Sequence, residues 1–220
     1  MESHQLINLI IERNKFSKYL EIGISTGYTF TRVKADIKDS VDPYFDNEFY
    51  NMDGYVEYPV KYRITSDEFF DTIAPTLGYK YDLIFIDGLH ISEQVDKDIE
   101  NSLKYLNEDG VVILHDCNPK KEYQQIIPRT QGEWYGDVWK SFVKFVHYNN
   151  SEYICFIIDA DTGIGLITKN TRYINLDKLI NTDIQIEDKL HWENFKSRKT
   201  EMVNIITSTD LILNEYKGIL

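Results

Sequence analysis

The sequence of 220 residues predicts an α/β fold, in which helices cover both faces of a doubly wound, mostly parallel sheet. Two observations predict it. Short apolar runs alternate with segments of helical periodicity, as expected for repeated strand–helix–strand units with right-handed crossovers. Near residue 160, two apolar runs flank Asp159–Gly163, which indicates a hairpin and therefore an antiparallel closing strand.

Apolar spacing and proline position the elements of the first half. Four apolar residues between Leu6 and Ile11 recur at helical spacing and predict an opening helix. A strand ends at Val41 and Asp42, because Pro43 has no N–H to give to a ladder. In order, the elements expected after the first helix are a strand at 18–23, a helix at 27–35, the strand ending at Asp42, a strand at 60–64 and a helix at 67–73.

The second half contains the strand with the strongest signal. Residues 81–87 form a nearly unbroken apolar run, typical of a central parallel strand that is covered on both faces. Asp109 and Gly110 turn the chain into another strand. The expected elements are a helix at 92–106, a strand at 111–114, a helix at 138–147 and the two hairpin strands at 153–158 and 164–168.

The pattern becomes helical beyond residue 171, and residues 187–216 predict a long or broken helical tail. We therefore expect one domain over residues 1–170 and a helical C-terminal extension over residues 171–220. The extension either packs on the domain or joins two copies in a homodimer. Residues 44–58, rich in Tyr and Phe, predict an insertion that is either a flap over a pocket or a packed surface loop.

Composition limits the kinds of partner that we expect this protein to bind. A formal net charge of −12 disfavours nucleic acid and anionic membrane surfaces, so a small molecule or a neutral sugar fits better. Cys117 and Cys155 lack metal-finger spacing and indicate reduced thiols. The apolar run at residues 6–11 is too short for a signal peptide or a membrane span, and we expect a cytoplasmic protein.

The loop after the first expected strand has two interpretations. Glu21, Gly23, Ser25 and Gly27 lie between a strand and a helix, where small residues let the backbone approach a nucleotide-like cofactor. The same letters also match the G-x-S-x-G turn of serine hydrolases, with Ser25 as the nucleophile. That turn should follow several strands, and here it follows the first, which favours the cofactor.

Two further strand ends support a cofactor. A ribose needs a carboxylate at the end of the second strand, about twenty residues after the glycine loop, and Asp42 is in that position. Ser66 and Asp67 come at the end of the third expected strand, where an adenine edge would lie. A full G-x-G-x-x-G loop, the usual sign of a nicotinamide dehydrogenase, is not present.

Titratable residues follow the next two strands. Asp87 and His90 end one of them, and His115, Asp116 and Asn118 end the other, so all should meet at one edge of the sheet. Carboxylate and amide oxygens suit Mg²⁺, and a histidine can remove a proton from a hydroxyl. Structural roles are the alternative: Asp87 as a cap, His115 as a core residue and Asp116 in a turn.

These motifs together resemble class I S-adenosylmethionine (SAM)-dependent methyltransferases over about residues 16–170. The resemblance implies a Rossmann-like, seven-stranded sheet with an antiparallel last strand. It also implies that Glu21 and the loop, with Gly23, Ser25 and Gly27, hold the methionine end of SAM, where many members have glycine in place of Ser25. Asp42 would then hold the ribose, Ser66 and Asp67 would meet the adenine, and Asp87 would contact the cofactor.

The pair D-G-x-H and H-D is similar to small-molecule and sugar O-methyltransferases. This resemblance implies Asp87 and Asp116 as metal ligands, Asn118 as a secondary ligand and His90 as the general base, whereas His115 stands where that group has an acid. The implied activity is methyl transfer from SAM to a hydroxyl of a small molecule, sugar or glycan, with or without Mg²⁺. The alternatives are a catalytically inactive cofactor-binding protein of the same fold and a serine hydrolase.

Overall fold

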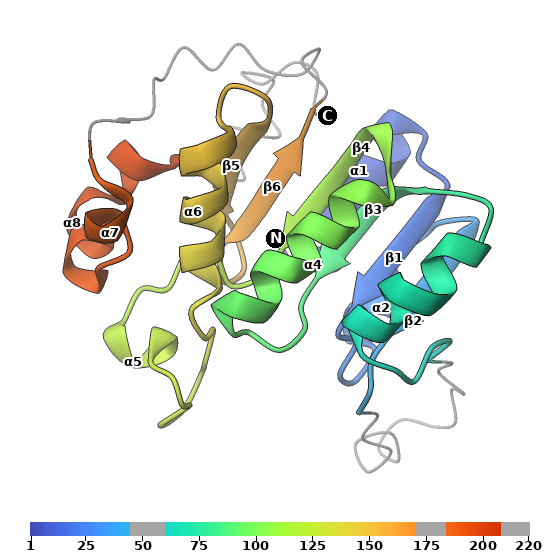
Figure 1. The fold of residues 1–220 in the computed structure, drawn as a ribbon, viewed down its shortest axis with the longest axis horizontal. Helices are drawn as coiled ribbons and strands as arrows, with labels where there is room; N and C mark the ends of the chain where they lie inside the picture. Colours follow the sequence, from blue (N-terminus) through green and yellow to red (C-terminus); the bar gives the residue numbers. More distant parts are fainter. Residues whose placement is uncertain (45–59, 170–183, 208–220) are drawn as a thin grey trace.

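The computed structural model describes residues 1–44, 60–169 and 184–207 (Figure 1). Its strands are β1 (Lys18–Ile22), β2 (Ile37–Val41), β3 (Tyr81–Ile86), β4 (Leu106–Leu114), β5 (Ile154–Asp159), β6 (Ile164–Thr168) and β7 (Asn204–Thr207). Its helices are α1 (Ser3–Asn14), α2 (Tyr28–Arg32), α3 (Ser66–Glu68), α4 (Ser92–Lys104), α5 (Glu122–Gln125), α6 (Val138–Asn149), α7 (Ile186–Lys189) and α8 (Trp192–Met202). Further helical turns over Phe69–Ile73 and Ala74–Thr76 continue α3.

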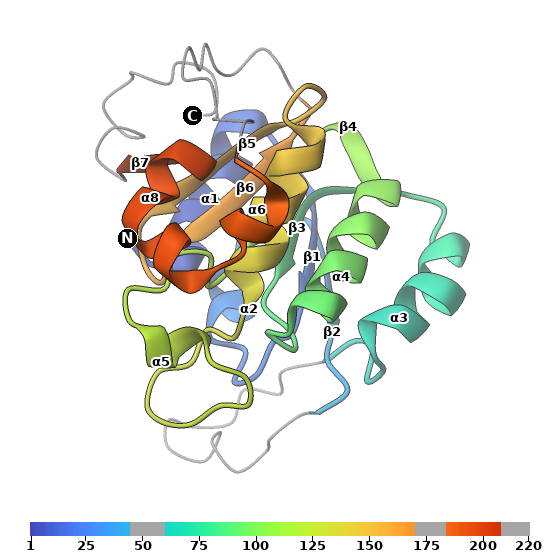
Figure 2. The same cartoon turned by 60° about the vertical axis from the view of Figure 1, so that its left-hand side comes forward.

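One seven-stranded sheet in the order β2-β1-β3-β4-β6-β5-β7 forms the centre of the molecule. Strands β2, β1, β3 and β4 pair in parallel, whereas β6 runs antiparallel to both β4 and β5. The views in Figures 1 and 2 show α4 and α6 on one face of this sheet and α1 on the other. The predicted doubly wound sheet with an antiparallel closing strand is therefore confirmed.

The prediction of a strand at residues 60–64 is wrong. Tyr62 makes a single parallel bridge to Val41, and no other described residue of that segment joins the sheet. The reason is that α3 begins four residues later, where Thr65 caps it by accepting a hydrogen bond from the Glu68 N–H. The chain therefore turns into a helix before a ladder can extend.

The C-terminal tail is helical in α7 and α8, as predicted, but it then adds strand β7, which the sequence analysis did not anticipate. Strand β7 pairs in parallel with β5. Helix α8 packs on the domain through Phe195, which is fully buried and stacks on Trp139 with 4.2 Å between ring centroids. The predicted insertion at 44–58, the boundary at 170/171 and the end of the tail lie almost wholly outside the described residues.

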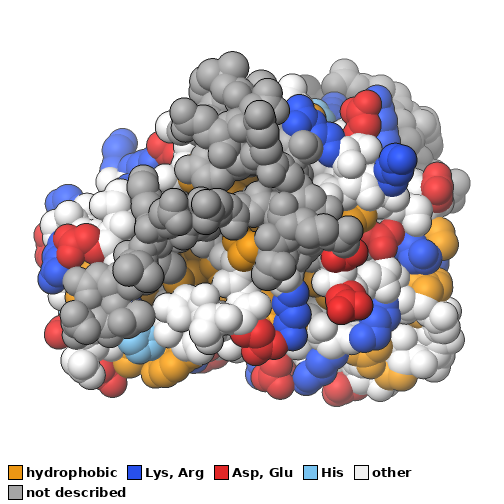
Figure 3. Space-filling model, turned by 90° about the horizontal axis from the view of Figure 1, so that it is seen from above, with side chains coloured by type: hydrophobic (Ala, Val, Ile, Leu, Met, Phe, Trp, Pro, Cys, Tyr) orange, Lys and Arg blue, Asp and Glu red, His pale blue; other side chains and the backbone are white. Residues whose placement is uncertain are grey.

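Two apolar clusters fill the space between the sheet and its helices. One joins β1, β3 and β4 to α4 and α6, and the other joins the opposite face of the sheet to α1 and α2. Both described cysteines are buried and free. Among the described helices, none is both long and apolar enough to cross a membrane. Basic and acidic side chains of the described residues are interspersed on the face seen in Figure 3.

Candidate active site

The glycine loop ties three strand ends together. The Gly23 N–H donates to the Val41 carbonyl of β2, and the Asp87 N–H donates to the Ile22 carbonyl of β1. Gly23 has φ of +81°, and a Cβ built on it would lie 2.2 Å from the Asp87 carbonyl oxygen. No side chain fits there, which lets the backbone ends of β1 and β3 pack directly against each other.

Asp42 holds this loop in place. One carboxylate oxygen accepts hydrogen bonds from the N–H groups of Ile24 at 2.9 Å and Ser25 at 3.0 Å. The other oxygen accepts from the Tyr44 N–H at 2.8 Å. Three backbone donors thus bind the buried carboxylate to the loop, a structural role that adds to the predicted ribose contact.

A pocket of about 460 Å³ opens above the ends of β1, β2 and β3. Six of the predicted cofactor residues line it together: Gly23, Ser25, Asp42, Ser66, Asp67 and Asp87. A nucleoside fits a pocket of this size. The pocket lies at the carboxyl edge of the parallel strands, where ligands of doubly wound sheets bind.

Two other predicted cofactor residues, Gly27 and Glu21, are not among the residues that line this pocket. Gly27 has φ of +72° and starts α2 as its N-cap. Glu21 is almost fully buried beneath the loop, where it accepts a hydrogen bond from the Tyr19 hydroxyl. Burial raises the pKa of Glu21 to about 8. These residues shape the loop without lining the pocket.

A second pocket of about 270 Å³ adjoins the first at Asp87. The residues that line it come from the start of α1, from α2 and from the edge of the sheet: Glu2, Ser3, His4, Tyr28, Thr29, Asp87, His115 and Asp161. Asp161 accepts hydrogen bonds from the N–H and the hydroxyl of Ser3. Sequence reasoning missed Ser3, Thr29 and Asp161, because only the folded chain brings the N-terminus to this edge.

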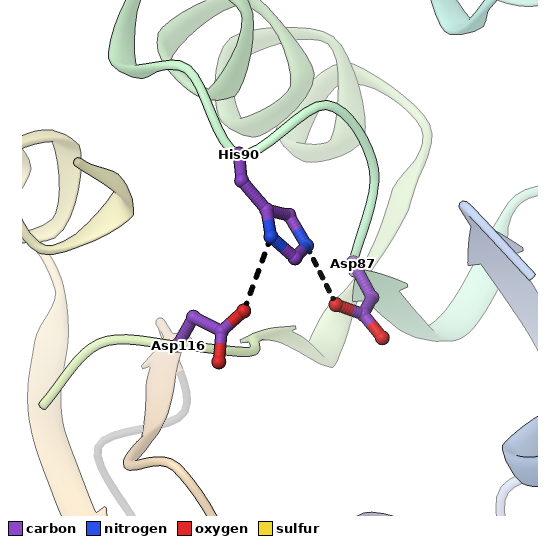
Figure 4. Close-up of side chains that lie close together, drawn as sticks. All are labelled: Asp87, His90 and Asp116. Atoms are coloured by element: carbon purple, nitrogen blue, oxygen red, sulfur yellow. Dashed lines mark hydrogen bonds and ion pairs between the residues drawn. The ribbon is translucent and has the colours of Figure 1, made fainter. Parts of the chain in front are cut away.

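Two carboxylates, of Asp87 and Asp116, converge on the imidazole of His90 (Figure 4). Nε2 of His90 lies 3.0 Å from Oδ1 of Asp87, and Nδ1 of His90 lies 3.2 Å from Oδ2 of Asp116. His90 and Asp116 both have positive φ, of 59° and 62°. Such backbone strain is typical of functional loops. The predicted meeting of Asp87, His90 and Asp116 is thus observed.

His115 joins the same group. Its Nδ1 lies 3.2 Å from Asp87 and 3.3 Å from Asp116, and its Nε2 lies 3.1 Å from the Thr162 hydroxyl. Burial would lower its pKa, but the charge of Asp87 and hydrogen bonds to neighbouring carboxylates raise it well above its ordinary value. His115 is therefore an electrostatic partner of both carboxylates and not an ordinary core histidine.

The other titrating groups respond to the same charges. Burial opposes ionisation of Asp87, but His115 and His90 outweigh it and lower the pKa of Asp87. Burial likewise opposes protonation of His90, whereas the hydrogen bond and charge of Asp87, with the charge of Asp116, raise its pKa. Asp87 and each of the two imidazoles thus stabilise one another's charged forms.

Asn118 does not join the cluster. Its Nδ2 donates to Asp159 at 3.0 Å, and its Oδ1 accepts from Nζ of Lys199 at 2.8 Å. Lys199 belongs to α8, so Asn118 connects the β5–β6 hairpin to the C-terminal tail. In this structure the Asn118 amide oxygen faces an ammonium group, whereas Asp87, His90 and Asp116 bring possible ligand atoms close together, and the ligand role of Asn118 stays a prediction.

A loop before α6, at residues 134–137, packs against His90. Trp134 lies over the His90 ring, with 5.7 Å between centroids. The Asp137 N–H donates to the His90 carbonyl, and the Asp137 carboxylate accepts from the N–H and hydroxyl of Ser92. At Gly136, with φ of +60°, a Cβ would lie 1.8 Å from the His90 carbonyl oxygen. Residues 134–137 therefore hold the backbone and ring of His90.

The donor set is compatible with a divalent cation. One atom each of Asp87, His90 and Asp116 lies within 4.8 Å of the others. Carboxylate oxygens suit Mg²⁺, and the added imidazole also suits Mn²⁺ or Zn²⁺.

Comparison with known proteins points to the methyltransferases. Residues 20–117 match a family model described as a methyltransferase domain. An O-methyltransferase from Streptomyces achromogenes, involved in tomaymycin synthesis and solved in complex with SAM, aligns with a TM-score of 0.52 at 14% identity, covering 76% of this chain and 78% of the other. An O-methyltransferase from Bacillus cereus in complex with S-adenosylhomocysteine (SAH) aligns with a TM-score of 0.52 at 15% identity, covering 77% and 82%. No match was found among curated proteins.

The fold and the domain match define the class. At these identities the solved structures show a shared fold, and the family model covers the Gly23 loop, Asp42 and the Asp87–Asp116 cluster. The chain has the fold of class I methyltransferases, and its residues 20–117 match a methyltransferase domain. The resemblance inferred from the loop and the strand ends is thereby confirmed. The metal role of the Asp87–His90 motif stays a prediction.

Proposed function

We propose that this methyltransferase transfers the methyl group of SAM to a hydroxyl of a small molecule, such as a sugar or glycan. The observation that carries the proposal is Asp87, which lines the nucleoside-sized pocket and also contacts the imidazoles of His90 and His115. A cofactor bound in that pocket would have one end beside an imidazole, a group that can accept a proton. The O-methyltransferases of similar fold, solved with SAM or SAH, support this assignment.

The pockets suggest how the cofactor lies. The adenosyl group would occupy the larger pocket, where Gly23 allows close approach and Asp42 has about one lone pair left for a ribose hydroxyl. The methionine end would reach the smaller pocket, past Asp87. There the carboxylates of Asp87 and Asp161 can meet its ammonium group, and the Thr29 hydroxyl can meet its carboxylate.

The reaction needs orientation and one proton acceptor. The acceptor oxygen attacks the methyl carbon as the bond from carbon to sulfur breaks, and the products are a methyl ether and SAH. For His90 to take the hydroxyl proton, one ring nitrogen must leave the carboxylate that it faces, Asp87 at 3.0 Å or Asp116 at 3.2 Å, while the other nitrogen stays bonded to its carboxylate. Asp87 and Asp116 stabilise the imidazolium that forms, as the raised pKa of His90 indicates. Most of the acceleration comes from holding the two reactants in line.

A divalent cation would be held by Asp87 and Asp116. When bound, it would lower the pKa of the acceptor hydroxyl and orient it. The net charge of −12 favours a neutral acceptor over an anionic one.

The test starts with the cofactor. Calorimetry with SAH, with and without Mg²⁺, should show binding to the wild type and a loss of at least tenfold in Asp42→Ala, since the loop loses its anchor. Asp71→Ala, which removes an exposed acid after α3, is the matched control and should bind as the wild type does. Absence of SAH binding by the wild type would refute the proposal.

The second step is turnover. SAM and a panel of sugar and phenolic hydroxyl acceptors should release SAH in the wild type, and His90→Gln should lower the rate by about 10²–10⁴ at unchanged SAH affinity. SAH binding without turnover on any acceptor would instead support an inactive cofactor-binding protein. Labelling of Ser25 by a fluorophosphonate would support the hydrolase alternative.

A further inference from the structure

Large apolar side chains that remain exposed gather at the carboxyl edge of the sheet. Six such side chains are exposed among the described residues, and four of them belong to the segments that follow β1, β2, β3 and β4: Tyr28, Tyr44, Leu89 and Ile127. Tyr44 and Leu89 line the larger pocket, and Tyr28 lines the smaller one. Exposed apolar surface beside a ligand pocket is typical of a surface that binds another molecule.

Apolar side chains from two loops lie beside His90. Leu89 precedes His90 in the chain, is 59% exposed and lines the larger pocket. Trp134 is half-buried, and its ring lies 5.7 Å from the His90 ring with 31° between the two planes. Ile127 is 41% exposed and follows Ile126, whose carbonyl accepts a hydrogen bond from the Trp134 indole at 2.7 Å. We refer to Leu89, Ile127 and Trp134 as the apolar rim of the proposed general base.

The three side chains of the apolar rim have no free hydrogen-bonding group. The indole N–H is the only polar atom of the Trp134 side chain, and it already donates to a carbonyl. Polar side chains of the same loop have partners too, because Asp137 accepts from Ser92 and Glu133 accepts from Gln124. A sugar ring against the apolar rim would bury hydroxyls without partners, which is unfavourable, whereas an apolar ring gains from burial.

We propose that the methyl acceptor is a phenol, whose flat ring lies against the apolar rim while its hydroxyl faces His90. The inference rests on the proposed function and names the class of its acceptor. The aromatic face of Trp134 favours an aromatic ring over a saturated ring of the same size. A phenol is uncharged at neutral pH, which suits a protein with a net charge of −12. The phenol oxygen bonds to the methyl carbon as the bond from carbon to sulfur breaks, its proton passes to His90, and the products are an aryl methyl ether and SAH.

Three compounds test the proposal by their binding to the wild type saturated with SAH: naphthol, its saturated analogue decahydronaphthol, and methyl glucoside. Calorimetry should show a preference for naphthol over methyl glucoside of about tenfold or more, since only naphthol buries apolar surface. Naphthol should also exceed decahydronaphthol by about threefold to tenfold, because only naphthol has an aromatic face. With SAH in place of SAM, these differences report binding and not the reactivity of the hydroxyl.

Variants of the apolar rim locate the binding surface. Leu89→Asn changes an exposed side chain, on which folding depends little, and should weaken naphthol binding by about tenfold at an SAH affinity within about threefold of the wild type. With SAM, the same variant should raise KM for naphthol more than it lowers kcat. Trp134→Leu keeps apolar bulk without an aromatic face and should bind naphthol and decahydronaphthol within about twofold of each other.

Tyr148→Asn is the matched control, because Tyr148 is 63% exposed on α6 and lines neither pocket. It should leave all three affinities unchanged. Equal binding of naphthol and methyl glucoside by the wild type, or unchanged naphthol binding in Leu89→Asn, would overturn the phenol assignment and leave methyl transfer to a hydroxyl intact. A naphthol preference that persists in Trp134→Leu would likewise count against an aromatic acceptor. Failure of the wild type to bind SAH would overturn the proposed function itself.

Discussion

The cofactor pocket is shaped largely by backbone, whereas the cluster of Asp87, His90 and Asp116 is held by side chains and by a loop from a distant part of the chain. In the pocket, glycine lets β1 approach β3, and Asp42 binds backbone N–H groups. In the cluster, each imidazole bridges carboxylates, and residues 134–137 press on His90. We therefore expect backbone substitutions to separate cofactor binding from catalysis.

The largest effect is expected for Gly23→Ala. A methyl group at this position meets the Asp87 carbonyl at 2.2 Å and adds the strain of a positive φ. The loop and the end of β3 must move apart, so SAH affinity should fall by about 10² or more, with a loss of stability of about 3 kcal/mol. Calorimetry and thermal unfolding measure the two quantities.

Gly78→Ala is the control for this substitution. Gly78 also has a positive φ, of 71°, but a Cβ there meets nothing within 4 Å. It should lose about 1 kcal/mol of stability from strain alone and keep its SAH affinity. If the two variants bound SAH equally, direct packing of the glycine loop on Asp87 would not shape the pocket.

Gly136→Ala should lower turnover and leave SAH affinity nearly unchanged, whereas Gly23→Ala should lower SAH affinity. Its methyl group collides with the His90 carbonyl, so His90 shifts while the glycine loop stays in place. A misplacement of about 1 Å costs about 10² in rate, and SAH affinity should change by less than about threefold. Turnover with an acceptor that the wild type uses, and the rate at which diethylpyrocarbonate modifies His90, report the shift.

Gly132→Ala lies in the same loop and is its control, because its Cβ would come no closer than 3.7 Å to Tyr123. We expect it to retain turnover within about threefold of the wild type. Equal loss in both variants would assign the effect to the loop as a whole and not to its contact with His90.

The contrast also explains what the sequence can predict. Gly23, Asp42 and Asp87 each follow a strand, and parallel strands bring their carboxyl ends to one edge, so a linear pattern predicts their meeting. Trp134 and Asp161 reach the site through loop paths that no local periodicity encodes.

Fold prediction failed where elements are short. Residues 60–64 have the alternation of a strand, yet the cap at Thr65 starts a helix too soon for a ladder to form. Strand β7 has four residues, of which Ile205, Ile206 and Thr207 favour a strand, but a run this short after α8 gives no clear strand signal without its pairing with β5. Asn118 shows the same limit, because its partner Lys199 lies 81 residues away.

Glu21→Gln should change the stability of the protein in a pH-dependent way, at a buried position beneath the glycine loop. The pKa of Glu21 rises from 4.5 to about 8 on folding, so the folded state binds a proton in this window and the wild type loses stability as pH rises. Gln needs no proton and should accept the same Tyr19 hydroxyl. Near pH 6 we expect the variant to be more stable by about 2 kcal/mol, at about 1.4 kcal/mol per pH unit above 4.5.

Denaturant unfolding at several pH values measures this difference, which should vanish near pH 4, where both states of the wild type are protonated. A difference that does not change between pH 4 and 7 would mean that Glu21 is ionised in the folded protein. Glu21 would then act as a charged group, like Asp87, and not as an uncharged group that supports the loop.

The smallest effect is expected for Asn118→Ala, which tests the outer limit of the cluster. The variant loses hydrogen bonds to Asp159 and Lys199 and should lose about 1 kcal/mol of stability. Asp116→Asn, in contrast, removes a carboxylate that faces both imidazoles. Titration with Mn²⁺, followed by electron paramagnetic resonance, should show binding that is weakened in Asp116→Asn and unchanged in Asn118→Ala. Loss of Mn²⁺ affinity in both variants would return Asn118 to the ligand group, and its bond to Lys199 would then have to break when a cation binds.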